Sequence, residues 1–175
     1  MNYMRLGDFV SLKQGLAINA GTVHLVSDVK DDKFPYPLLR IADMENNNYV
    51  KFISKEVNEN VVANYNDIIY TRTGQIGLAF THKVGVVHNN CFVVSVVEKG
   101  LDRDYLYAIL KSDFVRNQAI ALSHSSVQPD LTHDMFKSII IPLPSLEQQI
   151  RIAEVYLQIM SIVEKNNRVN DNLAA

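Results

Sequence analysis

The carboxy-terminal stretch constrains the fold more than any other part of the chain. Pro142 and Pro144 end an apolar run, because proline cannot donate a hydrogen bond to a neighbouring strand. Ser145 followed three residues later by Gln148 has the spacing of a capping box, in which each side chain bonds the other residue's backbone N–H. Residues 146–173 contain neither glycine nor proline. The sequence therefore predicts one long helix that starts directly after Ser145.

This predicted helix has two apolar stripes. The first is expected to pack against the chain's own globular part and consists of Leu146, Ile150, Ala153, Leu157 and Met160. The second has alternating spacings of three and four residues and consists of Ile152, Val155, Ile159, Ile162, Asn166, Val169 and Leu173. A helix that packs on one body needs only one stripe, and a lone Asn at a seam position is typical of coiled coils. We therefore expect the second stripe to bind another helix. The alternative is a helix buried whole within one domain, and the many polar residues after Val163 disfavour it.

The composition is that of a globular chain without an evident affinity for nucleic acid. Of its 175 residues 47% are hydrophobic, which suffices for one domain with a core plus an appendage. No apolar run reaches membrane-spanning length, and a single cysteine cannot form an internal disulfide, so a reducing, cytoplasmic setting is expected. The net charge is −2, and residues 1–144 keep 14 of the 17 basic and 15 of the 19 acidic residues. Strong attraction to phosphate would therefore require basic residues that cluster in space, or a partner that supplies the contact.

The rest of the chain predicts a single α+β body. Buried and alternating apolar runs predict strands at residues 23–26, 37–43, 49–53, 67–73, 76–82, 84–88, 91–97 and 137–141. From Asp102 the apolar period becomes helical, with a further cap at Ser112 and Asp113 and a helical turn at 132–136. The expected fold class is α+β, with a mainly antiparallel, strongly bent sheet in a globular part at residues 1–143 and the long helix at residues 144–175.

Four landmarks along the chain are similar to those of one protein family. They are LGD at residues 6–8 with KQG at 13–15, NDIIYTRTGQIG at 66–77, SSVQPDL at 125–131 and PLPSLEQQI at 142–150. In this order they resemble the landmarks of the DNA-specificity subunits of Type I restriction–modification enzymes. The resemblance implies a target-recognition domain at residues 1–143 and a conserved spacer and dimerisation helix at residues 144–175.

The resemblance also implies a function and partners. A specificity subunit binds double-stranded DNA and docks a modification (methyltransferase) subunit, while other subunits bind S-adenosylmethionine and cut DNA. Family members usually carry two recognition domains and two helical regions, whereas this chain has one of each. It would therefore be a half-length subunit that forms a homodimer and reads a palindromic, interrupted site, or a fragment. The rival interpretation is a protein-interaction module whose helix assembles a complex without touching nucleic acid, and the near-neutral charge favours it.

The candidate DNA contacts lie in loops. At the end of a predicted strand, Arg72 could pair with a phosphate or a guanine edge, or be a solvated turn residue; its group comprises Arg72, Thr73, Gly74 and Gln75. A second group offers short donors and acceptors, or only satisfies its own backbone, and comprises His124, Ser125, Ser126 and Gln128. Lys13 and Gln14 are expected either to contact the DNA backbone or only to be solvated, and Lys83 to flank the same face.

No set of residues predicts chemistry of the chain's own. Cys91 lies in an apolar strand run, which is typical of a core thiol. The five histidines show no ligand spacing, so neither a metal site nor a cofactor is expected. The chain lacks the Asn-Pro-Pro-aromatic step and the glycine-rich loop of an adenine methyltransferase, and a stand-alone nuclease would need a carboxylate cluster for a divalent metal. A non-catalytic recognition subunit is therefore expected.

Overall fold

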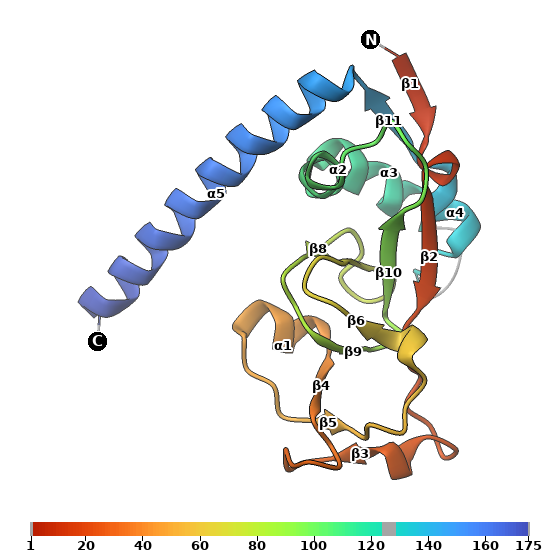
Figure 1. Cartoon of the computed structure of the whole chain (residues 1–175), viewed down its shortest axis with the longest axis vertical. Helices are drawn as coiled ribbons and strands as arrows, with labels where there is room; N and C mark the ends of the chain where they lie inside the picture. Colours follow the sequence, from red (N-terminus) through yellow and green to blue (C-terminus); the bar gives the residue numbers. More distant parts are fainter. Residues whose placement is uncertain (1, 124–128, 175) are drawn as a thin grey trace.

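The computed structural model describes residues 2–123 and 129–174, and it shows an α+β body from which one long helix projects (Figure 1). The strands of the described residues form sheets of two, four and five strands. Their pairs are antiparallel except for β4 (Tyr36–Leu39) and β9 (Gly85–Val87), which run parallel. The predicted fold class, a mainly antiparallel α+β body followed by a long C-terminal helix, is confirmed.

The four-stranded sheet carries the main core. Its strands, in spatial order, are β2 (Val10–Gln14), β10 (Cys91–Val96), β7 (Ile68–Thr71) and β8 (Ala79–Phe80). The central strands β7 and β10 read IIYT and CFVVSV, runs that suit a sheet buried on both faces. The helices packed on this core are α2 (Arg103–Leu110), α3 (Asp113–Ser123) and α4 (His133–Ser138). Fully buried Phe136 of α4 meets Tyr70 and Phe92 edge to face, with ring centroids 4.9 and 5.7 Å apart.

Side-chain caps fix where these helices begin. The Asp102 carboxylate accepts hydrogen bonds from the backbone N–H groups of Asp104 and Tyr105, and the Thr132 hydroxyl accepts one from Met135. Ser112 accepts a longer bond, 3.4 Å, from the N–H of Val115. The helix starts predicted at Asp102 and Ser112 are therefore confirmed, because these short polar side chains satisfy first-turn donors.

The five-stranded sheet forms a smaller layer. Its strands, in spatial order, are β3 (Val26–Ser27), β5 (Phe52–Ile53), β4, β9 and β6 (Val62–Ala63). The strand predicted at 23–26 is mostly wrong, because Val23–Leu25 form a 3-10 turn. The strand predicted at 37–43 ends at Leu39, because α1 (Ile41–Asn46) follows and Arg40 binds Asp43 of its first turn at 2.6 and 2.9 Å. The strand predicted at 49–53 is shorter and begins at Phe52.

The two-stranded sheet leads into the long helix. β1 (Asn2–Arg5) pairs with β11 (Ile140–Leu143), and α5 (Leu146–Ala174) follows with 29 residues. The predicted capping box is present: the Ser145 N–H donates to Gln148 Oε1 at 3.2 Å, and the Gln148 N–H donates to Ser145 Oγ at 3.4 Å. The single long helix predicted for this stretch is confirmed.

The face of α5 that packs on the body differs from the predicted one. Leu146 and Ile150 are exposed, whereas Gln149 is fully buried and Ala153 is nearly so. Tyr156 packs edge to face on Tyr107 of α2, with 6.2 Å between the ring centroids. The remaining members of the predicted stripe, Leu157 and Met160, are half-buried. The apolar pattern misplaced this face because the buried contact at its start is polar: Gln149 bonds backbone groups that Leu146 or Ile150 could not satisfy.

Replacing Phe136 by Ala should lower the free energy of unfolding by about 3–5 kcal/mol, because it removes the ring between Tyr70 and Phe92. Phe114→Ala is the matched control, since Phe114 is 47% exposed and should cost less than about 1 kcal/mol. Urea unfolding of both variants measures the difference. Equal losses would contradict the assignment of the core.

Candidate nucleic-acid interface

Arg72 holds together segments that are far apart in the sequence. It directly follows β7, and its guanidinium lies 2.6 Å from the Asp130 carboxylate. The same group donates longer bonds, each 3.4 Å, to the backbone carbonyls of Leu131 and Asn89. In return, the Leu131 N–H donates to the Arg72 carbonyl at 3.0 Å. Arg72 therefore joins the end of β7, the β9–β10 turn and the segment that precedes α4. It is neither a solvated turn residue nor a guanidinium free of protein partners.

The end of β2 joins the same group. Gln14 Nε2 donates to the Asn89 carbonyl at 2.8 Å, so Gln14 and Arg72 share one acceptor. The chain then passes so close to the β9–β10 turn that a Cβ on Gly15 would lie 2.3 Å from the His88 carbonyl oxygen, and only glycine fits. We call Gln14, Arg72, Asn89 and Asp130 the loop cluster. Lys13 is exposed but turns to the opposite face of β2, because side chains alternate along a strand.

The turn after Arg72 combines a fixed base with an open tip. Thr71 Oγ1 donates to the Gln75 carbonyl at 2.5 Å and accepts from the Leu78 N–H at 2.8 Å, which ties the two sides of the turn. Gly77 has φ 93° and lies against the Arg116 side chain. Gly74 has φ 74° and is exposed with open space around it, and Gln75 is exposed beside it. The tip can therefore approach a ligand without rearranging its base.

The turn after β7 lies next to the residues that flank positions 124–128. A hollow of about 410 Å³ is lined by Gly74 and Gln75 and also by Ser123 and Pro129, the described residues on either side of those positions. Thr73 and Asp130 form a β-bridge at the same place. Four predicted contacts fall outside the described residues, and they are His124, Ser125, Ser126 and Gln128.

Lys83 is not brought to the loop cluster. Its ammonium donates to the side-chain oxygen of Asn47. It lines a different hollow of about 700 Å³, together with Lys111, which directly follows α2, and with Glu164 of α5. Burial lowers the pKa of Lys83, and the nearby Glu164 opposes that shift. Lys83 therefore faces the long helix.

The loop cluster carries little net positive charge. Asp130 neutralises Arg72, and Asp43 neutralises Arg40. Burial lowers the pKa of His88, and Arg40 lowers it further, which favours the neutral imidazole. The side chains of the cluster are two amides, one guanidinium and one carboxylate, and these side-chain types can read base edges by hydrogen bonds.

The thiol of Cys91 is part of the core. It is fully buried, and burial raises its pKa to about 12 against the opposing effect of Arg72. Such a thiol is not a nucleophile near neutral pH. Among the residues that the structure describes, no three His, Cys, Asp or Glu side chains are grouped so that they could hold a metal ion.

The second stripe of α5 is exposed along its described length. Ile152, Val155, Ile159, Ile162 and Val169 are between 44% and 57% exposed, and Asn166 is exposed among them. The side chain of Leu173 lies outside the described part of the chain. An exposed stripe that is apolar except for one Asn is typical of an interaction surface. No helix in the described ranges, α5 included, is long and apolar enough to cross a membrane.

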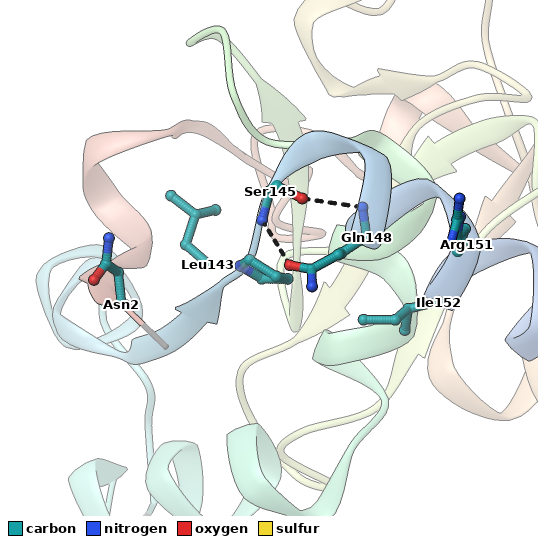
Figure 2. Close-up of a pocket in the computed structure, with 7 residues that line it drawn as sticks. Asn2, Leu143, Ser145, Gln148, Arg151 and Ile152 are labelled. Carbon is teal, nitrogen blue, oxygen red and sulfur yellow. Dashed lines mark hydrogen bonds between the residues drawn. The ribbon is translucent and has the colours of Figure 1, made fainter.

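A hollow of about 680 Å³ lies where this stripe begins, and Figure 2 shows residues that line it. Its lining residues include Asn2 and Leu143 of the two-stranded sheet and Ser145, Gln148, Arg151 and Ile152 of the helix start. The capping-box bonds between Ser145 and Gln148 run along it (Figure 2). Ile152 belongs to both the hollow and the stripe, so the two form one continuous surface.

Sequence reasoning missed three residues that organise these surfaces. Asn89 contributes through its backbone carbonyl, which no side-chain pattern reveals. Asp130 contributes an ion pair with a residue 58 positions away. Gln149 carries one available signal: it lies four residues before Ala153 and seven before Tyr156, at helical spacing with the face that packs on the body.

His88 should give the protein a pH-dependent stability. Its pKa in the folded protein is below the usual 6.5, so the unfolded chain binds the proton more readily. The free energy of unfolding should therefore have its full value above pH 6.5 and fall as the pH drops below that value. We expect His88→Gln to make this fall shallower, whereas His24→Gln, at an exposed position, should not. Urea unfolding over a pH series measures both, and parallel curves for wild type and His88→Gln would contradict the account.

Comparison with known proteins identifies relatives in sequence. Residues 1–174 match the family model described as Type I restriction modification DNA specificity domain. The specificity subunit of Type I restriction enzyme MjaVIII from Methanocaldococcus jannaschii is 26% identical over 168 residues, covering 94% of this chain and 37% of that protein. That of MjaIX from the same organism is 27% identical over 106 residues, covering 61% and 24%. The chain thus spans less than two fifths of these relatives.

Solved structures share the fold. The HsdS subunit from Thermoanaerobacter tengcongensis superposes with a TM-score of 0.68 at 19% identity, over 96% of this chain and 39% of that one. The S subunit of a Type I restriction–modification system from M. genitalium gives 0.62 at 15% identity, over 98% and 44%. Because the family model covers nearly the whole chain, the chain belongs to the family of Type I restriction–modification DNA specificity domains, which are non-catalytic recognition modules.

Proposed function

We propose that the chain reads one half of a bipartite site in double-stranded DNA, and that it does so as the specificity component of a Type I restriction–modification assembly. One observation carries the proposal: two segments predicted from sequence to contact DNA, at the end of β2 and after β7, converge around Arg72, and Asp130, two residues after the predicted contact Gln128, pairs with it. A DNA reader needs such convergence, because base edges in a groove must be met by several groups at once.

The turn after β7 supplies the reading groups in this proposal. Gly74 and Gln75 lie at its exposed tip, and Thr73 forms the β-bridge to Asp130. Arg72 acts here mainly by holding the neighbouring segments at a fixed separation, since its guanidinium already has protein partners. The predicted contacts at His124, Ser125, Ser126 and Gln128 remain part of the proposal, because their flanking residues adjoin Gly74 and Gln75. Lys13 turns to the other face of β2, so a phosphate contact from it would be separate from the loop cluster. Lys83 is not part of this surface.

The exposed stripe of α5 supplies the partner surface. We infer that two copies pair through Ile152, Val155, Ile159, Ile162, Asn166, Val169 and Leu173. A two-fold pair would place two readers on a palindromic, interrupted site, because protein symmetry maps onto the half-sites. The same helices would dock a modification subunit, and the assembly would work in the cytoplasm. The near-neutral charge of the loop cluster is consistent with a partner that supplies much of the phosphate contact.

The rival function is a protein-interaction module that does not touch nucleic acid. The exposed stripe fits this rival as well as it fits the DNA reader, and so does the near-neutral charge. Binding of a defined duplex by the purified chain distinguishes the two functions, because a protein-interaction module that does not touch nucleic acid would bind no duplex.

Arg72→Ala should weaken binding about tenfold or more to a duplex enriched by the wild-type chain from a random pool, because the loops lose their common anchor. Arg103→Ala is the matched control: this arginine also pairs with an aspartate, but it lies with Asn66 and Thr81 toward the other edge of the sheet. Fluorescence anisotropy at one fixed salt concentration measures both. Unchanged affinity of a folded Arg72→Ala protein would remove the loop cluster from the DNA interface.

Ile159→Asp should make the chain monomeric, because a carboxylate at the centre of the stripe would be buried without a partner in the dimer. Ser161→Asp introduces the same charge at an exposed position between the two faces of α5 and should leave the dimer intact. Sedimentation equilibrium reports the mass of each variant. A dimer that survives Ile159→Asp would refute the stripe as its interface.

A further inference from the structure

Gln149 is the fully buried polar side chain at the root of α5. Its Oε1 accepts a hydrogen bond from the Asp102 N–H at 2.8 Å. Its Nε2 donates to the Gly100 carbonyl at 2.8 Å and to the Pro144 carbonyl at 3.0 Å. The side-chain amide thus bonds two backbone groups in the segment just before α2 and one in the segment that leads out of β11. Its amide oxygen and amide nitrogen both have partners, so any rotation of the helix root breaks at least one bond.

Through Asp102 this anchor reaches the next element. The backbone N–H of Asp102 bonds Gln149, while its carboxylate caps α2 by accepting from Asp104 and Tyr105. Further along α5, Ala153 is buried and Tyr156 packs on Tyr107 of α2. These three contacts, at residues 149, 153 and 156, fix the direction of the first turns of α5 relative to the body. Figure 1 shows the rest of the helix leading away from the sheets.

Beyond Met160 the described side chains give no comparable support, because each of them from Ser161 to Asn170 is exposed. Where α5 passes α2 and the β8 edge, the lining of the intervening hollow is mostly polar and includes Lys83, Lys111, Glu164 and Asn167. The direction of the far half is therefore set at the root.

A small change in the tilt of α5 at its root causes a large displacement of its far end. With 29 residues at about 1.5 Å each, α5 is about 43 Å long. A change of about 10° in its tilt would move the far end by about 7 Å, which is the length of about two base-pair steps of B-DNA.

We propose that Gln149 is the positioning residue that fixes the angle between the recognition body and α5, and that it thereby sets the gap between the two half-sites that a pair of chains can read. The gap is part of the target specificity, so Gln149 would determine specificity without touching DNA. This inference rests on the proposed function for its DNA consequence, but its geometric part does not.

The test compares Gln149→Met, which keeps the side-chain length and removes the three bonds, with Gln158→Met at an exposed position of the same helix. Nitroxide labels at Lys30→Cys on the body and Lys165→Cys on α5 report their separation by pulsed electron resonance, in pairs diluted with unlabelled chain. Gln149→Met should broaden this distance distribution at least twofold, and Gln158→Met should leave it as in the wild type. If Gln149→Met does not fold, Gln149→Glu retains the acceptor for Asp102 and takes its place.

The second readout uses duplexes whose half-sites are separated by gaps that differ by single base pairs. The wild-type chain should prefer one gap, and the preference over gaps two base pairs shorter or longer should fall at least fivefold in the Gln149 variant. Affinity for an isolated half-site should stay within twofold, which a general loss of structure would not allow. An unchanged distance distribution, or an unchanged gap preference, would overturn the inference. A wild-type chain that binds no duplex would end the proposed function, and the distance distribution would still decide whether Gln149 fixes the helix.

Discussion

The hydrogen bonds of the buried Gln149 amide join the two parts of this protein. A buried amide that lost its partners would leave Asp102 N–H and two carbonyls unsatisfied, so the native arrangement is strongly preferred over a tilted one. The capping box at Ser145 and Gln148 fixes where the helix begins, and Gln149 fixes where it points. Because the helix leaves the body in one direction, a partner bound to the exposed stripe would have a defined place relative to the body.

A second set of hydrogen bonds organises the loop cluster, which is the part of the body that we propose reads DNA. The ion pair between Arg72 and Asp130 collects strand ends and loops that come from four regions of the sequence. It also neutralises the charge that would otherwise attract phosphate. A reader built in this way should depend on hydrogen-bond geometry more than on counterion release, and so discriminate sequences without binding all DNA tightly. The Arg72 guanidinium lies over the buried Phe92 ring, with 5.6 Å to the ring centroid, and Phe92 packs against Phe136.

Periodicity and local chemistry predicted much of this architecture. The long helix, its capping box, the helical period from Asp102, the cap at Ser112 and the exposed second stripe follow from residues within one or two turns of each other. The strand predicted at 23–26 and the second half of the strand predicted at 37–43 were misjudged, because a 3-10 turn and helix α1 form in these segments. Such turns satisfy backbone hydrogen bonds locally, and an apolar run does not distinguish them from a strand. The pairing of Arg72 with Asp130, the role of the Asn89 carbonyl and the burial of Gln149 depend on tertiary contacts. Lys83 was assigned to the wrong face for the same reason: nearness in sequence to the loops does not give nearness in space.

The central claim is that two copies of one reader are held at a fixed separation. Selection of duplexes from a random pool by the intact chain, followed by sequencing of the retained fraction, tests it most directly. The account predicts enrichment of an inverted repeat whose halves are separated by a non-specific gap of one length. Enrichment of a single uninterrupted site, of halves with many gap lengths, or of nothing above background would contradict it.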